Sequence, residues 1–228
     1  MSSHPDYANP PIAEVALEVR FACAWKDDLS VLVQERFSAL YTGAQRTVPR
    51  LGESAPTTAT LLTSEDGTRF VGLAPSILTI HALGRYPGWE AFALQANEAI
   101  DLYIATTSPE GITRITVRYI DRISLPGEGA DIREYFTCVP GNPLSLPQTT
   151  DGFHLVLKGV APDGLMSLLT VAYDAADDNE VIYDINLTRK FTPKADLGSW
   201  RQMADQLHDQ QRQIFEDSIT EKTRELFK

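Results

Sequence analysis

Apolar and polar residues alternate near the start of the chain. Val15, Leu17, Val19 and Phe21 occupy odd positions, and mostly charged residues occupy the even positions between them. Because successive side chains of a strand point to opposite faces, this pattern predicts a half-buried strand with one face in the core. A second alternating run, residues 112–125, predicts another long strand of the same kind.

Three segments have apolar residues at the i, i+3 and i+4 spacing of an amphipathic helix. The first begins after Asp27 and ends at Gly43, and the second runs from about 89 to 105. The last opens at Ser199 and runs towards Lys228. Aspartate and serine favour helix starts because their side chains accept hydrogen bonds from the first free amides, and glycine favours helix ends.

Turn residues divide the rest of the chain into short strands. Four are predicted between 45 and 84, where Asp66-Gly67 marks a hairpin, and three between 153 and 191. A short helix near 131–136 and a loop rich in proline and glycine at 140–152 precede the last three strands.

The predicted elements form two similar series, residues 10–108 and 111–228. Each series begins with a strand, continues through a helix and several antiparallel strands, and ends in a long helix. Short matching sequences occur in the same order in both series. The matches are Val19-Arg20-Phe21 with Val117-Arg118-Tyr119, and Gly88-Trp89-x-x-Phe92 with Ser199-Trp200-x-x-Met203.

This order predicts an α+β protein of one domain. Its two duplicated halves would place their helices on one face of a continuous, curved antiparallel sheet. Joining the halves edge to edge removes a pair of exposed strand edges, which otherwise invite aggregation. The arrangement resembles the TATA-binding-protein fold or the helix-grip fold. A chance likeness between two α+β patterns is the alternative, and a fold alone does not fix a function.

Charge and composition narrow the function classes. The chain of 228 residues has a net charge of −11, which disfavours a broad nucleic-acid surface or an anionic membrane surface but leaves room for a local basic patch. No secretory signal pattern precedes the first strand, and no apolar run approaches the roughly 20 residues that span a bilayer. We expect a cytoplasmic protein, with Cys23 and Cys138 as free thiols.

A stripe of arginines is the first candidate site. Arg114, Arg118 and Arg122 fall on one side of the strand predicted at 112–125. Arginine recognises phosphate and carboxylate groups through two parallel hydrogen bonds, so the stripe is a candidate anion site.

Internal ion pairing is the other interpretation of this stripe. Glu14, Glu18 and Arg20 lie on the equivalent face of the first strand. If the two leading strands pair antiparallel, Glu14 and Glu18 are expected to meet Arg122 and Arg118. Cross-strand ion pairs of this kind contribute only roughly 0.2–1 kcal/mol each.

Three segments also carry a family resemblance. They are Asn9-Pro10-Pro11-Ile12-x-Glu14, Val117-Arg118-Tyr119-Ile120-Asp121-Arg122-Ile123, and His208 with Ile214-Phe215 and Ile219-Thr220. They resemble the opening, the arginine-tyrosine-isoleucine motif and the closing helix of a family of uncharacterised bacterial proteins. That family more often carries asparagine at position 121. The resemblance implies a one-domain chain and brings no established activity, but it adds Tyr119 and Asp121 to the candidate residues.

The histidines offer little metal chemistry. None has a partner at the i, i+4 helical spacing of a zinc site, and the sequence has no P-loop, nucleophile elbow or dinucleotide fingerprint. We therefore expect neither a metal nor a cofactor. His154 follows a long loop, and it either lines a cavity or is an ordinary histidine at a strand start.

The end of the last helix is rich in glutamine and mixed charge. His208, Asp209, Gln210 and Gln211 are expected to cover its outer face. This segment is either a helix for a dimer or another partner, or a single solvated helix.

Two functions remain after these exclusions. The first is a non-enzymatic binding or regulatory module that acts through protein contacts, including contacts in a homodimer. The alternative is a protein or enzyme that holds a small molecule, either on the arginine stripe or in a cavity between sheet and helices. Nucleic-acid binding by the sheet comes third because the net charge opposes it.

Overall fold

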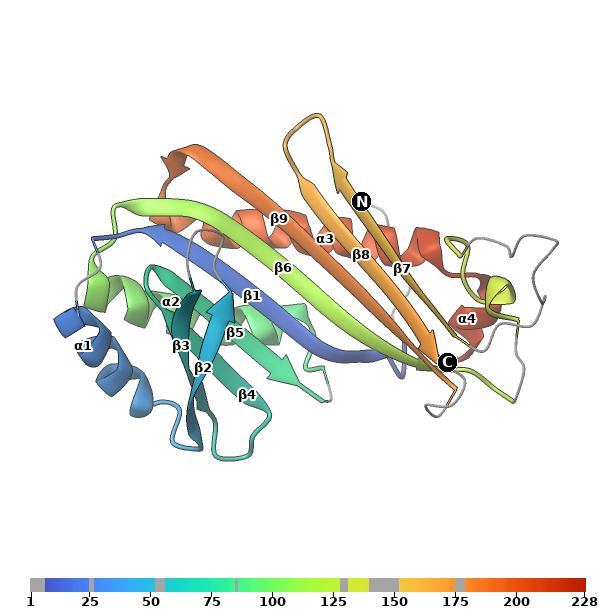
Figure 1. Ribbon diagram of the computed structural model, residues 1–228, viewed down its shortest axis with the longest axis horizontal. Helices are drawn as coiled ribbons and strands as arrows, with labels where there is room; N and C mark the ends of the chain where they lie inside the picture. Colours follow the sequence, from blue (N-terminus) through green and yellow to red (C-terminus); the bar gives the residue numbers. More distant parts are fainter. Residues whose placement is uncertain are drawn as a thin grey trace.

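Alternating polar and apolar residues build one antiparallel sheet of nine strands in the part of the chain that the computed structural model describes (Figure 1). That part comprises residues 7–24, 27–51, 56–84, 86–127, 131–139, 152–174 and 179–228. The strands are β1 (Ile12–Ala22), β2 (Gln45–Leu51), β3 (Pro56–Thr63), β4 (Arg69–Ala74), β5 (Ile77–Leu83), β6 (Gly111–Ser124), β7 (Gly152–Val160), β8 (Met166–Asp174) and β9 (Glu180–Ala195). The helices are α1 (Asp27–Ser38), α2 (Trp89–Thr107), α3 (Trp200–Ser218) and α4 (Glu221–Glu225), with single 3-10 turns η1 (Ile132–Glu134) and η2 (Leu197–Ser199).

The two leading strands, β1 and β6, lie side by side at the centre of the sheet. The strand order is β2-β3-β4-β5-β1-β6-β9-β8-β7, so the other strands of each predicted series lie on their own outer side. β1 and β6 pair antiparallel, with Leu17 opposite Val117 and Val19 opposite Ile115. The predictions of an α+β protein and of a continuous antiparallel sheet are therefore confirmed.

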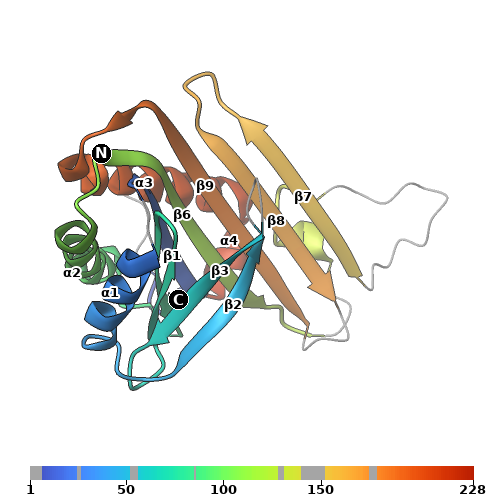
Figure 2. The same ribbon diagram turned by 60° about the vertical axis from the view of Figure 1, so that its left-hand side comes forward.

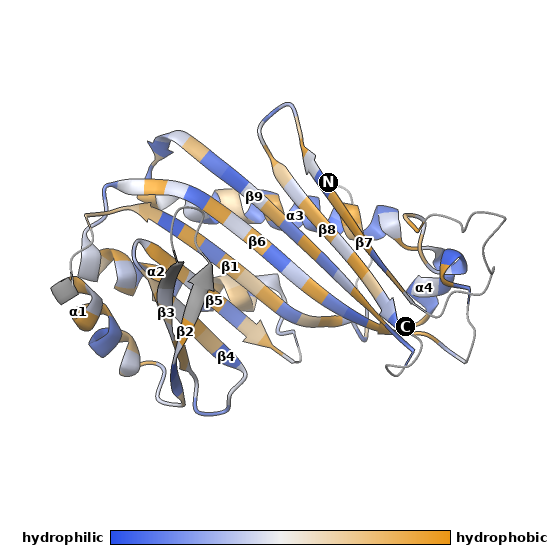
Figure 3. Ribbon diagram, in the orientation of Figure 1, coloured by the Kyte–Doolittle hydropathy of each residue, from blue (hydrophilic) through white to orange (hydrophobic). Residues whose placement is uncertain are grey.

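The helices lie on one face of the sheet, which we call the helix face (Figures 1 and 2). α3 packs on β6 and β9, α2 on β5, and α1 on β3 and β4. Along β6, Ile115, Val117 and Tyr119 are fully buried beneath the helices. Because side chains alternate along a strand, Arg114 and Arg118 lie on the opposite side, which we call the open face. Figure 3 shows this alternation of hydrophobic and hydrophilic residues along the central strands.

The last helix ends earlier than its sequence pattern predicts. The pattern extends towards Lys228, but α3 stops at Ser218 and the chain becomes extended at Ile219. Ile219 pairs with Phe136 in an isolated bridge, and the backbone N–H of Thr137 donates to the carbonyl of Ser218 (2.9 Å). Ile219 is buried, so packing of its side chain outweighs the hydrogen bonds that would continue the helix.

Other predicted segments agree with the structure or lie outside it. The short helix predicted at 131–136 is the 3-10 turn η1, and most of the loop predicted at 140–152 lies outside the described residues. Cys23 and Cys138 are free cysteines, and both are half-buried. Within the described ranges, no helix has the length and apolar character needed to cross a bilayer.

Packing of α2 against the sheet gives a test of this core. Ile100 is fully buried, whereas Leu94 on the same helix is 66% exposed. Ile100→Ala is expected to lower the free energy of unfolding by about 2–5 kcal/mol because it removes buried apolar volume and leaves a cavity. Urea denaturation measures this change. Leu94→Ala is the matched control and should stay within about 0.5 kcal/mol of the parent chain; equal losses would contradict this packing.

Candidate functional site

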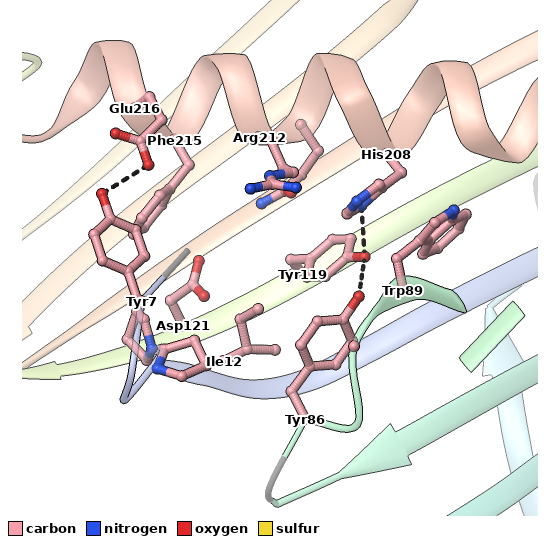
Figure 4. Close-up of a pocket in the computed structure, with 14 residues that line it drawn as sticks. Tyr7, Ile12, Tyr86, Trp89, Tyr119, Asp121, His208, Arg212, Phe215 and Glu216 are labelled. Carbon is pink, nitrogen blue, oxygen red and sulfur yellow. Dashed lines mark hydrogen bonds between the residues drawn. The ribbon is translucent and has the colours of Figure 1, made fainter. Parts of the chain in front are cut away.

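A cavity of about 350 Å³ lies between α3 and the helix face of the sheet. Its walls come from four parts of the chain: the segment leading into β1, the connection between β5 and α2, the middle of β6, and α3. Figure 4 shows their side chains converging on one space beneath α3. The volume falls within the range of roughly 300–1,000 Å³ that is usual for small-molecule sites.

Asp121 forms the floor of the cavity. Its odd position on β6 places it on the helix face, where it is 1% exposed and its Oδ2 atom has no hydrogen-bond partner among the described residues. Burial, with a smaller contribution from the negative charge of Asp184, raises the pKa of Asp121 from 3.8 to about 8. At neutral pH the carboxyl group is therefore mostly protonated and uncharged.

The segment before β1 covers this carboxyl group. The pairing register of β1 with β6 shifts between Ile12 and Glu14, so Ile12 lies opposite Asp121. The backbone N–H of Arg122 donates to the carbonyl of Pro11 (2.9 Å). This bond holds the proline segment against the end of the strand pair and keeps Asp121 away from solvent.

A chain of three polar side chains crosses one end of the cavity. The hydroxyl groups of Tyr86 and Tyr119 lie 3.0 Å apart, and the Tyr119 hydroxyl lies 2.8 Å from Nδ1 of His208 (Figure 4). Burial raises the pKa of Tyr86 to about 12 and that of Tyr119 well above its usual range. Both hydroxyl groups therefore stay protonated at neutral pH.

Trp89 forms the aromatic wall at this end. Its ring stacks on His208 with 4.4 Å between centroids and 6° between planes. Its Nε1–H donates to Oδ1 of Asp205 (2.7 Å), and Arg201 donates to the same oxygen (2.8 Å). Because Trp89 is held by both a stacking contact and a charge-assisted hydrogen bond, its ring has a fixed position in the wall.

The two ends of the described chain meet at the other side of the cavity. The Tyr7 hydroxyl donates to Oε1 of Glu216 (2.7 Å), and Arg224 donates to Oε2 of the same carboxylate (2.9 Å). The Tyr7 ring packs edge-on against Phe227, and the N–H of Asn9 donates to the Phe227 carbonyl (3.0 Å). Residues about 200 positions apart in the sequence thus close one wall together.

The cavity combines three kinds of chemical group. The floor is an uncharged carboxyl group, the walls are aromatic, and Arg212 projects into the space from α3 (Figure 4). A tyrosine whose pKa is raised is a poor general base at neutral pH. Among the described residues, no three histidine, cysteine or acidic side chains cluster as a metal site would require.

The arginine stripe lies on the open face and is paired within the chain. Arg118 makes two hydrogen bonds to Asp184 of β9 (2.9 and 2.7 Å), and Arg122 contacts Glu180 (3.1 Å). The register of β1 and β6 explains why Arg118 does not pair with a glutamate of β1, because Ala16 lies opposite Arg118. The predicted pairs of these arginines with glutamates of β1 are therefore wrong, although the wider expectation of internal pairing agrees with the structure.

The glutamates of β1 have other partners. Glu14 lies 2.7 Å from Nδ1 of His81, and this hydrogen bond holds the pKa of Glu14 below its usual range. Glu18 accepts hydrogen bonds from Arg20 (2.9 Å) and Arg114 (3.2 Å).

The candidate residues from the sequence are thus split between two faces of the sheet. Tyr119 and Asp121 line the cavity, whereas the arginines, Glu14 and Glu18 lie on the open face. His154 is exposed on β7, opposite Ala172 of β8, and it does not line the cavity.

The sequence interpretation missed His208 and Gln211. Both were expected on the outer face of the last helix, but they are buried (7% and 4% exposed) and line the cavity. Their spacing could have predicted their burial, because positions 204, 208, 211 and 215 share one side of a helix and include the buried Ala204 and Phe215. Polar residues on an otherwise apolar side mark a cavity that the helix covers.

A scan against protein-family models and a search of curated proteins found no match to this chain. The family resemblance carried by the segments around Pro10, Tyr119 and His208 therefore stays a prediction.

Removing the hydroxyl group of Tyr119 tests how much the hydrogen bonds among Tyr86, Tyr119 and His208 contribute to stability. Tyr119→Phe leaves both Tyr86 and His208 without the shared partner, so the free energy of unfolding should fall by about 1–3 kcal/mol. Tyr86→Phe removes only the terminal hydroxyl and should lower it by about 0.5–1.5 kcal/mol. Chemical denaturation of the two variants gives the comparison. A larger loss of unfolding free energy for Tyr86→Phe would show that Tyr119 is not the central member of this hydrogen-bonded group.

Proposed function

We propose that this chain binds a small molecule in the cavity beneath α3, without catalysing a reaction on it. The observation that carries this proposal is Oδ2 of Asp121, which is buried at the cavity floor and lacks a hydrogen-bond partner among the described residues. Leaving a buried polar atom unpaired costs about 1–3 kcal/mol. A ligand that completes this hydrogen bond offsets that cost.

The walls define the ligand's chemistry. A protonated Asp121 donates a hydrogen bond, so the ligand should present an acceptor such as an amide carbonyl or a ring nitrogen. Tyr7, Trp89 and Phe215 offer aromatic surface, which favours a flat, partly apolar ligand body. We therefore propose a small aromatic amide or heterocycle as the ligand class.

Titration with benzamide and nicotinamide tests this proposal, with tryptophan fluorescence as the readout. Trp89 lines the cavity, so a bound aromatic amide should quench its emission. Asp121→Leu has a similar shape but no hydrogen-bonding group, so it is expected to weaken binding about tenfold, the loss expected for one hydrogen bond.

Asp209→Leu is the matched control. Asp209 is exposed on α3 and does not line the cavity, so this variant should bind like the parent chain. The absence of saturable quenching by both amides, or equal affinity of the Asp121→Leu variant, would reject the proposal.

The raised pKa of Asp121 also predicts a pH dependence of stability. Between its unfolded value near 3.8 and its folded value of about 8, the folded chain holds one more proton than the unfolded chain. Stability from this group therefore falls as pH rises through that window. Asp121→Asn lacks this titrating group. As pH rises, the unfolding free energy of the variant minus that of the parent should therefore increase, by at most about 1.4 kcal/mol per pH unit. Urea denaturation at about pH 5 and about pH 8 measures the difference; an unchanged difference would contradict the raised pKa.

Contact with a second copy of the chain is our second candidate function. β7 is an edge strand of the sheet, and it exposes Val156 (42%), Leu157 (47%) and Val160 (74%). An exposed apolar edge can pair antiparallel with its own copy across a twofold axis.

Light scattering during size-exclusion chromatography tests this second candidate. The parent chain should elute as a dimer, and Val160→Lys should shift it to a monomer because a charge on the edge blocks strand pairing. A monomeric parent chain at high concentration would reject this function.

We also propose that the two halves arose by duplication, in an arrangement resembling the TATA-binding-protein or helix-grip fold. In support, β1 and β6 occupy equivalent central places, and each half places its later strands outward and ends in a long helix on the same face.

A further inference from the structure

The open face of the sheet is concave. Val48 of β2 and Asn186 of β9 line the same hollow, although five strands separate β2 from β9 in the sheet order. In a flat sheet these strands would lie about 29 Å apart, at about 4.8 Å per strand. Figure 2 shows β2 and β3 curling in front of the central strands.

A second hollow on this face collects positive charge. It has a volume of about 450 Å³ and lies over β1, β6 and β9, with β7 and β8 as its side wall. We call it the cationic hollow, because four cationic side chains line it with a single carboxylate, Glu18. The cations are Arg20, Arg114, Lys158 and Lys190. The whole chain, by contrast, has a net charge of −11.

Three of these cations stand in one row across the sheet. Arg20 lies directly opposite Arg114, and Arg114 lies directly opposite Lys190. Directly opposed side chains on antiparallel strands have Cβ atoms about 4.5–5.5 Å apart, and like charges at that distance destabilise the sheet. The row therefore needs balancing negative charge, and a bound anion would add to the charge that Glu18 supplies.

Glu18 neutralises only part of this charge. It contacts Arg20 (2.9 Å) and Arg114 (3.2 Å), both of which are mostly buried. In the described ranges, no carboxylate contacts the exposed Lys158 or Lys190. These two lysines frame the hollow from β7 and β9, and they can reach a ligand without breaking an internal ion pair.

The floor of the hollow adds neutral hydrogen-bonding groups. The hydroxyl groups of Thr116 and Thr188 lie 2.8 Å apart, and the Thr188 hydroxyl lies 3.3 Å from the side-chain oxygen of Asn186. All three residues line the hollow. Hydroxyl and amide donors beside several cations are the groups that bind oxygens of a multiply charged anion.

From this geometry we propose that the cationic hollow binds the phosphate group of a small phosphorylated molecule. A phosphate monoester carries a charge of about −1.5 to −2 and three strong acceptor oxygens, whereas a carboxylate carries a single charge. The cationic side chains and the threonine hydroxyls match that larger charge and oxygen number. This site lies on the open face, apart from the cavity beneath α3, and it does not depend on the function proposed there.

Calorimetric titration of the full chain with pyrophosphate at low ionic strength tests the proposal. We expect saturable binding at one site. Lys158→Gln and Lys190→Gln should each weaken binding about tenfold, because each removes one charge-assisted hydrogen bond to the anion.

Lys194→Gln is the matched control. Lys194 lies on β9 like Lys190, but it pairs with Glu110 and does not line the hollow. This variant should bind pyrophosphate like the parent chain, and thermal unfolding checks that all three variants are folded. No saturable heat from the parent chain would overturn the proposal. An equal loss in Lys194→Gln would also overturn it, because it would indicate a diffuse charge effect instead of a site.

Discussion

The antiparallel pairing of β1 with β6 is the constraint on which the rest of the structure depends. Its register places Leu17 opposite Val117 and so directs the apolar side of both strands towards the helices. The same register sends Glu18, Arg20 and Arg114 to the open face. A shift of one residue would exchange the two faces, because side chains alternate with a period of two. One pairing therefore determines both where the core lies and where the charge gathers.

Elements governed by local pattern could be predicted from the sequence. Alternation along 112–125 identified β6, and the equivalent places of the two leading strands in the two series made their antiparallel pairing one arrangement to consider. Ion-pair partners could not be predicted, because they depend on the register and on β9, whose Asp184 is 66 residues away from Arg118. A cavity between sheet and helices could be named from the sequence as an alternative, but its position and most of its lining could not be predicted. Its floor is one polar residue, Asp121, among apolar residues of β6. Asp121 becomes part of a cavity only because α3 packs over it.

The two faces separate two kinds of polar chemistry. Beneath α3, burial keeps Asp121 uncharged and favours hydrogen bonding with a neutral group. On the open face, solvent reaches the side chains, and charges of one sign are held together by strand register. In our two proposals, the first site selects its ligand by shape and hydrogen bonding, and the second by charge. Because helices cover only one side of this sheet, a single layer of strands can carry both kinds of site.

The contact between Tyr7 and Phe227 has a consequence for the order of folding. The cavity wall joins residues from opposite ends of the described chain, such as Tyr7 and Glu216, which are 209 positions apart, so forming it directly from the unfolded chain carries a large loop-closure entropy. We therefore infer that this wall forms late, after the central strands have paired. The ligand that we propose for the cavity would bind only chains that have completed this step. Its binding would therefore stabilise the completed fold by mass action, to a degree set by the ligand concentration.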